Sequence, residues 1–212
     1  MYERQQELLN ADQLASENIL IVGVGAIGRQ VALTLSAMGA KNITVCDMDL
    51  VDESNVATQG YSPRDIGKKK VAALQESVLS HFGLPITPKE SPWNPAEFRQ
   101  SNHTILFSCV DRMDVRRSLW IHAKRTPSIK YFLDGRMLAE MGHVFCYDRT
   151  SIEQYGETLF NDDEAIQGRC TRRGTLYMAS ILSNMMVGRR ALALRGVAAK
   201  NKYTFNLIGE MI

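Results

Sequence analysis

Apolar residues follow two alternating patterns along the chain from residue 18 onward. Short continuous apolar runs that end at a glycine or close to an aspartate predict buried parallel strands, and these runs occupy residues 19–22, 43–46, 104–107 and 131–133. Between the runs, apolar residues recur at helical spacing, which predicts helices over residues 26–38, 68–81 and 114–124. Strands that alternate with helices imply a parallel sheet with right-handed crossovers.

The last third of the chain has a different pattern. Residues 142–147 predict a strand at the sheet edge, and alternation at Tyr203, Phe205 and Leu207 predicts a final strand. Residues 151–169 are polar without a periodic signal, so we expect an extended or mobile loop, whereas residues 175–194 predict a long helix. The expected fold class is therefore α/β, with a Rossmann-like, mostly parallel sheet, helices on both faces and an antiparallel C-terminal extension.

Composition excludes several classes of protein. The 212 residues are 45% hydrophobic and 23% charged, with a net charge of +2, so no global field attracts nucleic acid or membrane. The N-terminal residues do not resemble a secretory signal, and no apolar run approaches the ~20 residues of a membrane helix. The cysteines are scattered without a Cys-x-x-Cys pair, which favours reduced thiols and a cytoplasmic location.

A glycine-rich turn joins the first predicted strand to the first predicted helix. Gly23 permits a tight turn, Gly25 lets a phosphate approach the backbone, and Gly28 allows close packing of helix and strand. Asp47 ends the second predicted strand, where a carboxylate can bind ribose hydroxyls. The motif predicts a nucleotide site but does not distinguish NAD, FAD and ATP, and its glycines could instead serve the turn alone.

The following segment resembles the ThiF/MoeB family, which has the fold of ubiquitin-activating enzymes. The segment reads Asp-x-Asp-x-Val from Asp47, Asn-x-x-Thr-Gln from Asn55 and Gly-x-x-Lys from Gly67, and it is followed by Asp111 with an arginine five residues later. The N-terminal Glu-Arg-Gln around Arg4 also resembles the family's start. The resemblance covers residues 1–135 well and the remainder weakly.

The resemblance implies ATP-dependent adenylation of the C-terminal carboxylate of a small ubiquitin-like or sulfur-carrier protein with a glycine-rich C-terminus. Lys70 would lie near the α-phosphate, Asp111 would hold Mg²⁺, and Asp47 would bind the ribose. Each assignment has an alternative, because Lys70 lies in a run of three lysines that could be solvated and Asp111 could cap the next helix.

Further roles also follow from the resemblance. Asn55 and Gln59 would orient phosphates or substrate, and Arg4 would contact phosphate across the interface of a homodimer. Asn55 could instead be a turn residue, and Arg4 could be a surface residue near a frayed terminus.

Two departures from the family pattern place the chain in a divergent branch. Thr58 stands where the family usually has arginine, and Arg64, six residues later, could compensate for it. Arg112 replaces the usual asparagine after Asp111. The family's zinc-binding Cys-x-x-Cys pairs are missing, so no metal beyond Mg²⁺ is expected.

Cys170 is the candidate for a later thioester or persulfide step. Nearby arginines and a predicted helix N-terminus would lower the pKa of its thiol, although a partly buried structural thiol is the alternative. Cys46, Cys109 and Cys146 are expected in the core.

We expect one domain over residues 1–212, with a helical segment at 1–17, a nucleotide-binding core at 18–135, and edge strands, a crossover loop and a C-terminal helix at 136–212. Three other functions remain open: an NAD-dependent oxidoreductase, a non-catalytic ThiF-like scaffold, and ATP-dependent activation of a small molecule or tRNA base.

Overall fold

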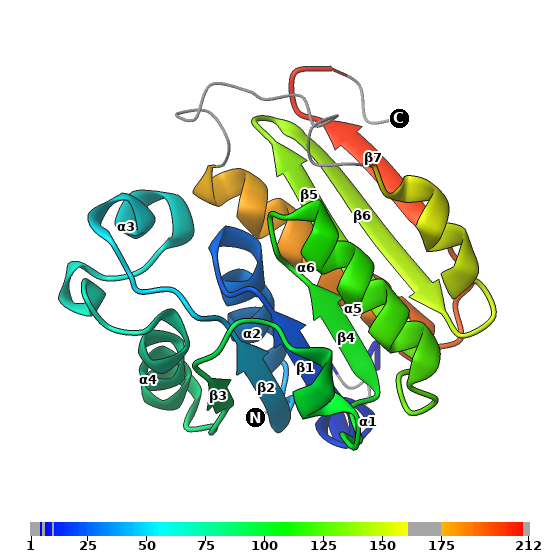
Figure 1. Cartoon of the computed structure of the whole chain (residues 1–212), viewed down its shortest axis with the longest axis horizontal. Helices are drawn as coiled ribbons and strands as arrows, with labels where there is room; N and C mark the ends of the chain where they lie inside the picture. Colours follow the sequence, from blue (N-terminus) through cyan, green and yellow to red (C-terminus); the bar gives the residue numbers. More distant parts are fainter. Residues whose placement is uncertain (1–4, 6, 10, 161–174, 210–212) are drawn as a thin grey trace.

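One sheet organises the part of the chain that the computed structural model describes, which is residues 5, 7–9, 11–160 and 175–209. Its strand order is β3-β2-β1-β4-β5-β6-β7 (Figure 1). The strands are β1 (Asn18–Val22), β2 (Asn42–Cys46), β3 (Thr87–Lys89), β4 (Ile105–Ser108), β5 (Tyr131–Leu138), β6 (Met141–Asp148) and β7 (Lys202–Asn206). The first five in this order run parallel, and β6 and β7 each pair antiparallel with the preceding strand. The fold is thus α/β, mostly parallel with an antiparallel C-terminal extension.

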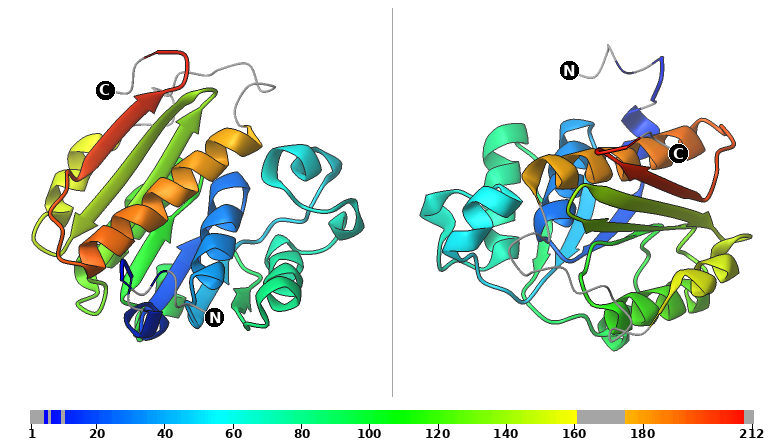
Figure 2. Two further views of the ribbon diagram at one scale, coloured as in Figure 1. Left: turned by 180° about the vertical axis from the view of Figure 1, so that it is seen from behind. Right: turned by 90° about the horizontal axis from the view of Figure 1, so that it is seen from above.

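Helices cover both faces of the sheet (Figure 2). The α-helices are α1 (Ala11–Ala15), α2 (Ala26–Ala37), α3 (Glu53–Gln59), α4 (Lys70–Phe82), α5 (Met113–Arg125) and α6 (Leu176–Leu194). Short 3₁₀ helices are η2 (Pro63–Asp65), η3 (Pro95–Phe98) and η4 (Ile152–Thr158). In the described residues, no helix is long and apolar enough to cross a bilayer.

The strand side chains divide between two cores because successive residues point to opposite faces. Ile19 and Ile21 of β1 pack with α2, α4 and α6, whereas Leu20 and Val22 pack with α5, η3 and η4. Both faces of the sheet are therefore buried from solvent at β1, which explains why β1 is a continuous apolar run in the sequence.

Most predicted elements are confirmed within a few residues, but the C-terminal half brings two corrections. β5 continues past the expected end at Asp134 to Leu138, because all eight of its residues pair with β6 in a hairpin. Part of the expected loop at 151–169 is instead η4, since Ile152 and Tyr155 are buried against the sheet. Residues 161–174 of that loop lie outside the described residues.

The pattern analysis missed α3 and β3. α3 begins at a local capping box, in which Asp52 Oδ1 accepts from Asn55 N and Asn55 Oδ1 accepts from Asp52 N. β3 is a three-residue edge strand that contains Pro88, too short for a periodic signal.

Candidate functional site

The predicted site residues gather at the carboxyl-end edge of the parallel strands. The glycine turn follows β1, Asp47 follows β2, and Asp111 lies three residues after β4. Because β1 pairs with both β2 and β4, these three segments are neighbours in space. This edge is where open α/β sheets bind ligands.

Two glycines of the turn are required by the backbone itself. Gly23 has a φ of 84°, and a Cβ there would lie 2.7 Å from the carbonyl oxygen of Cys109. A Cβ at Gly28 would lie 1.9 Å from the carbonyl oxygen of Gly23. Any side chain at either position would displace backbone atoms, so helix α2 can pack this close to β1 and β4 only with glycine.

Gly25 differs from its two neighbours in the motif. The atoms nearest to a Cβ there belong to the side chain of Gln59, the first at 3.7 Å, which is ordinary van der Waals contact. Gly25 is the N-cap of α2, and no side chain caps this helix. The first N–H groups of α2 therefore lack a side-chain acceptor, and together with the helix dipole they suit a phosphate.

Asp47 is built into this turn. Its Oδ2 accepts a hydrogen bond from Val24 N at 2.8 Å, and its Oδ1 accepts from Asp49 N at 2.9 Å. Each carboxylate oxygen has a further lone pair for a ribose hydroxyl. The carboxylate is thus fixed beside the glycine turn.

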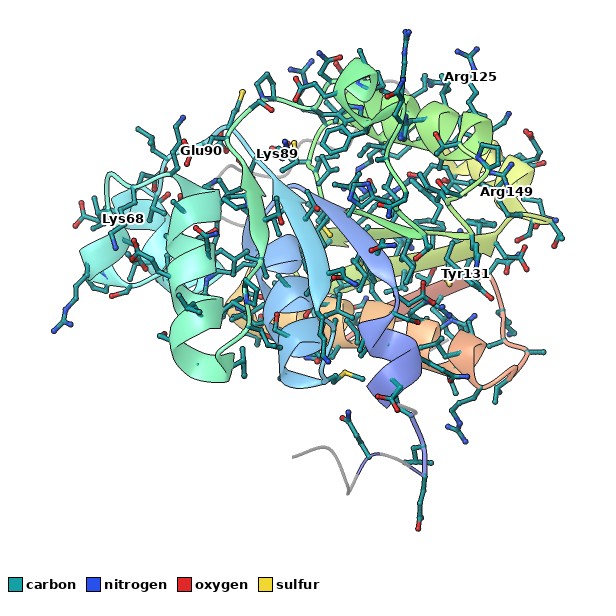
Figure 3. All side chains as sticks on the ribbon, turned by 90° about the horizontal axis from the view of Figure 1, so that it is seen from below. Lys68, Lys89, Glu90, Arg125, Tyr131 and Arg149 are labelled. Carbon is teal, nitrogen blue, oxygen red and sulfur yellow. The ribbon has the colours of Figure 1, made fainter. Side chains whose placement is uncertain are left out.

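Lys70 is the most buried member of the three-lysine run. Its side chain is 8% exposed, and Nζ lies 3.0 Å from Asp49 Oδ2. Lys68 instead pairs with Asp65 and Glu76 at the periphery beside α3 and α4 (Figure 3). The run is therefore not a uniformly solvated face, because Lys70 is held on the Asp47–Asp49 segment.

The two amides assigned to phosphate orientation have different environments. The capping box occupies the Oδ1 atom of Asn55, and its Nδ2 donates to Ser54 Oγ at 3.3 Å. The side chain of Gln59 lies over Gly25, and its buried Oε1 has no hydrogen-bond partner among the described residues. Gln59 is therefore available to a ligand at the turn, whereas Asn55 fixes the start of α3.

Asp111 is exposed, and no described residue bonds its carboxylate. Arg112, not Asp111, is the N-cap of α5, and no side chain caps that helix, so Asp111 is not used as a cap. Arg112 pairs with Asp114 in an exposed ion pair. Thr58 donates from Oγ1 to Ser54 O at 2.7 Å, and Arg64 is exposed without a described side-chain partner.

The predicted residues Arg4 and Cys170 lie outside the described residues. Cys46 and Cys146 are buried strand residues, and burial raises the pKa of each thiol to about 11. Cys109 follows β4 and is half-buried by exposure, and burial likewise raises its pKa. These three thiols are protonated at neutral pH and suit packing better than nucleophilic chemistry.

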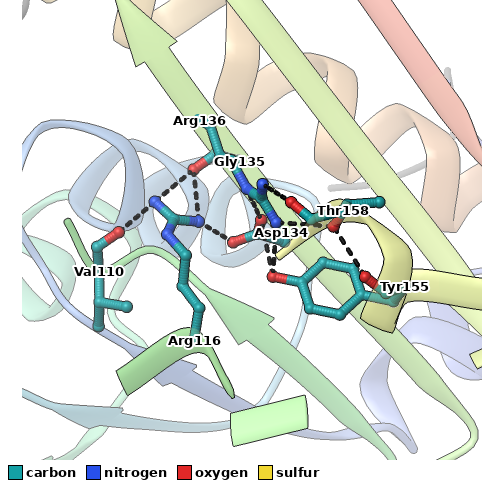
Figure 4. A network of polar contacts seen from close by, with 7 residues as sticks. All are labelled: Val110, Arg116, Asp134, Gly135, Arg136, Tyr155 and Thr158. Carbon is teal, nitrogen blue, oxygen red and sulfur yellow. Dashed lines mark hydrogen bonds and ion pairs between the residues drawn. The ribbon is translucent and has the colours of Figure 1, made fainter. Parts of the chain in front are cut away.

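A buried charge cluster beside the site was not predicted (Figure 4). Asp134 is fully buried and pairs with Arg116 of α5 and Arg136 of β5, and it accepts from Tyr155 Oη at 3.0 Å. Arg116 also donates to the carbonyl of Val110, next to Asp111. Asp134 near the predicted strand end and Arg116, the arginine five residues after Asp111, were the local signals, whereas Tyr155 lies in a stretch without a pattern.

Comparisons with known proteins agree with this architecture. A profile of the ThiF family matches residues 3–208. The molybdopterin-synthase adenylyltransferase of Escherichia coli strain K12 is 29% identical over 112 residues, covering 51% of this chain and 45% of the relative. SUMO-activating enzyme subunit 2 of Dictyostelium discoideum is 33% identical over 128 residues, covering 55% of this chain and 19% of the relative. Each match therefore spans less than half of the relative's length.

Solved structures share the fold at low identity. A crystal structure of PaaA superposes with a TM-score of 0.77 at 18% identity, covering 97% of this chain and 65% of PaaA. E. coli MccB with AMPCPP and MccA superposes with a TM-score of 0.72 at 12% identity, covering 100% of this chain and 66% of MccB. Since the family profile spans nearly the whole sequence and the glycine turn, Asp47, Lys70 and Asp111 gather at one sheet edge, the chain belongs to the ThiF family.

Proposed function

We propose that this protein uses ATP to adenylate the C-terminal carboxylate of a small ubiquitin-like or sulfur-carrier protein and releases pyrophosphate. The observation that carries the proposal is the uncapped, glycine-built N-terminus of α2 between Asp47 and Gln59. Family membership and the names of the relatives, an adenylyltransferase and an activating-enzyme subunit, support the same class of enzyme.

In the proposed reaction, a carboxylate oxygen of the carrier attacks the α-phosphorus of ATP. A phosphorus–oxygen bond to the carrier forms, the bond to the β-phosphate breaks, and pyrophosphate leaves with the electron pair. The ammonium of Lys70 has three donors and gives one to Asp49, so two remain to stabilise the charge that develops on the α-phosphate. Asp47 binds the ribose.

Asp111 would hold Mg²⁺, directly or through water, because magnesium prefers few carboxylates together with phosphate oxygens. Its exposed carboxylate without a described partner fits such a contact. The ion supplies charge neutralisation on the phosphates. Arg116 fixes the preceding carbonyl of Val110, which restrains the position of Asp111.

Several finer parts of the proposal rest on the sequence alone. Residues 1–212 act as one adenylation domain in a cytoplasmic homodimer, with Arg4 reaching the partner's phosphates. After adenylation, the Cys170 thiolate attacks the acyl carbon of the carrier, so that a thioester forms and AMP leaves; a persulfide link in place of the thioester would require a separate donor of persulfide sulfur. Cys170→Ser is therefore expected to leave adenylation intact and to stop only the later thiol step.

A non-catalytic scaffold is the second candidate, and Thr58 favours it. Its hydroxyl is bonded to the helix backbone, and threonine cannot make the bidentate, permanently charged phosphate contact of an arginine. A scaffold requires no contribution from Lys70 or Asp111.

The first test is calorimetric titration with ATP plus Mg²⁺ and, separately, with NAD. Binding of ATP but not NAD is expected. Binding of NAD without binding of ATP would contradict the proposal and favour the NAD-dependent oxidoreductase. Binding of neither nucleotide would favour the non-catalytic scaffold.

The second test is adenylate formation with a carrier protein, and the exchange of pyrophosphate into ATP is its readout. Lys70→Ala and Asp111→Ala are each expected to abolish exchange while the protein stays folded. Lys68→Ala is the matched control, because Lys68 Nζ pairs with Asp65 and Glu76 at the periphery and not with the site. Wild-type exchange in either site variant contradicts the assignment.

A further inference from the structure

Arg29, in the first turn of α2, carries a half-buried guanidinium without an anionic partner. Its Cζ lies 5.0 Å from the centroid of the Tyr61 ring. Its Nε is buried without a hydrogen bond, and no described carboxylate forms an ion pair with it. Burial lowers the pKa of Arg29, although Tyr61 and Asp65 oppose the shift.

A guanidinium that has lost water normally has a carboxylate beside it. The two buried arginines of the described chain follow this rule, since Arg116 pairs with Asp134 and Arg190 pairs with Glu17. Arg189, which is half-buried, lies over Tyr203 without a described carboxylate, as Arg29 lies over Tyr61. Arg29 thus has no ion pair among the described residues, and Asp65 acts on its charge only from beyond ion-pair distance.

The contacts around Arg29 lead back to the glycine turn. Tyr61, on which the guanidinium lies, donates from Oη to Val24 O at 2.7 Å. One guanidinium nitrogen, Nη1, lies 3.3 Å from the place of a Cβ at Gly60. Gly60 directly follows Gln59, whose side chain covers Gly25.

These contacts place Arg29 beside the proposed phosphate site. Asp47 is bonded to Val24 N, Gln59 covers Gly25, and Arg29 Nη1 adjoins Gly60, the residue after Gln59. With the ribose on Asp47 and the first phosphates at the α2 N-terminus, the remaining phosphates are the part of the nucleotide left for Arg29.

We propose that Arg29 binds the terminal phosphates of ATP, so that the guanidinium distinguishes a nucleoside triphosphate from a monophosphate. The inference rests on the proposed function and names a binding residue beyond Lys70 and Asp111. A planar fork of donors stacked on Tyr61 is suited to bidentate phosphate contact. In the adenylation reaction, the same contact holds the departing pyrophosphate.

The test is calorimetric titration of the full chain with ATP and with AMP, each with Mg²⁺. Arg29→Gln is expected to weaken ATP binding about 10- to 100-fold, the range for loss of a charged hydrogen bond, and to leave AMP binding unchanged. Arg29→Lys keeps the positive charge but lacks the planar set of guanidinium donors, so its ATP affinity is expected to lie between those of the wild type and Arg29→Gln. The unliganded variants should lose little melting temperature, because the guanidinium has no described ion pair to lose and its contact with the Tyr61 ring is worth only about 0.5–1 kcal/mol.

Arg189→Gln is the matched control. Arg189 Cζ lies 4.9 Å from the centroid of the Tyr203 ring, so it repeats the stacked arrangement. It is 13 residues along α6 from Leu176, which lies near Gly60, a separation of about 20 Å at ~1.5 Å per residue. Its loss should not change ATP binding.

Wild-type ATP affinity in Arg29→Gln overturns the inference and leaves the proposed function standing. An equal loss of ATP and AMP affinity also overturns it, since that result indicates a purely structural role. Failure of the wild type itself to bind ATP overturns the proposed function together with the inference.

Discussion

At the scale of single residues, the glycines of one motif have separate physical roles. Gly23 and Gly28 are required because a Cβ would collide with backbone oxygen, whereas Gly25 has room for one. The first two therefore serve the packing of α2 on the sheet, and Gly25 serves the approach of a ligand.

This difference predicts opposite phenotypes for two alanine substitutions. Gly28→Ala is expected to lower the free energy of unfolding by about 1–3 kcal/mol, the usual cost of forcing extra atoms into a packed site. Gly25→Ala is expected to cost about 0.5–1 kcal/mol, because alanine is a poorer N-cap than glycine, and to reduce ATP affinity, because the methyl group occupies the phosphate space. Denaturant unfolding and calorimetry measure the two effects, and equal destabilisation by both substitutions would contradict the assignment.

At the scale of elements, the Asp134 cluster connects three of them beside the site. Arg116 comes from α5, Asp134 and Arg136 from β5, and Tyr155 from η4. Arg136 also donates to the carbonyl and hydroxyl oxygens of Thr158 at 2.7 and 2.9 Å. The cluster therefore joins η4 and α5 to the sheet and restrains the segment that carries Asp111.

Asp134→Asn is expected to destabilise the fold by about 3–5 kcal/mol, because it leaves two buried guanidinium groups without their carboxylate. Asp114→Asn is the matched control, since it breaks an exposed arginine–aspartate pair on the same helix and should cost about 0–1 kcal/mol. Chemical denaturation of both variants measures the contrast. Similar losses of unfolding free energy from the two substitutions would show that the Asp134 cluster stabilises the fold no more than an exposed ion pair does.

At the scale of the whole molecule, a buried histidine couples stability to pH. His103 is 9% exposed, and its Nε2 lies 3.2 Å from Thr44 Oγ1. Burial, together with the smaller effect of the nearby His122, lowers the pKa of His103 to about 4. The unfolded chain, with a histidine pKa near 6.5, therefore binds a proton that the folded protein excludes between about pH 4 and 6.5.

Stability is consequently expected to be full above about pH 6.5 and to fall as the pH drops toward 4. From pH 7 to pH 5, His103 accounts for a loss of about 2 kcal/mol. His103→Gln should remove this part of the pH dependence, whereas His81→Gln, which removes an exposed histidine of α4, should not. Urea unfolding at pH 7 and pH 5 measures the free energy of unfolding of each variant. An equal pH dependence of that free energy in both variants would exclude His103 as its cause.

Local sequence determined the alternation of strands and helices and the position of the nucleotide turn. Periodicity is a property of neighbouring residues, so β1, α2 and α6 could be predicted to within a few residues. Short motifs at the ends of predicted elements likewise singled out Gly23, Gly28, Asp47 and Lys70, and the structure brings these residues to one edge of the sheet, while their roles toward a ligand stay predictions.

Tertiary structure alone decided the parts that depend on residues distant in sequence. The length of β5 depends on its hairpin partner β6. The burial of Asp134 depends on Arg116 and Tyr155, and the unpartnered state of Arg29 becomes visible only when Tyr61 and Gly60 are placed around it. The physical reason is that desolvation and ion pairing are set by what surrounds a side chain, whereas helix and strand periodicity are set by the backbone itself.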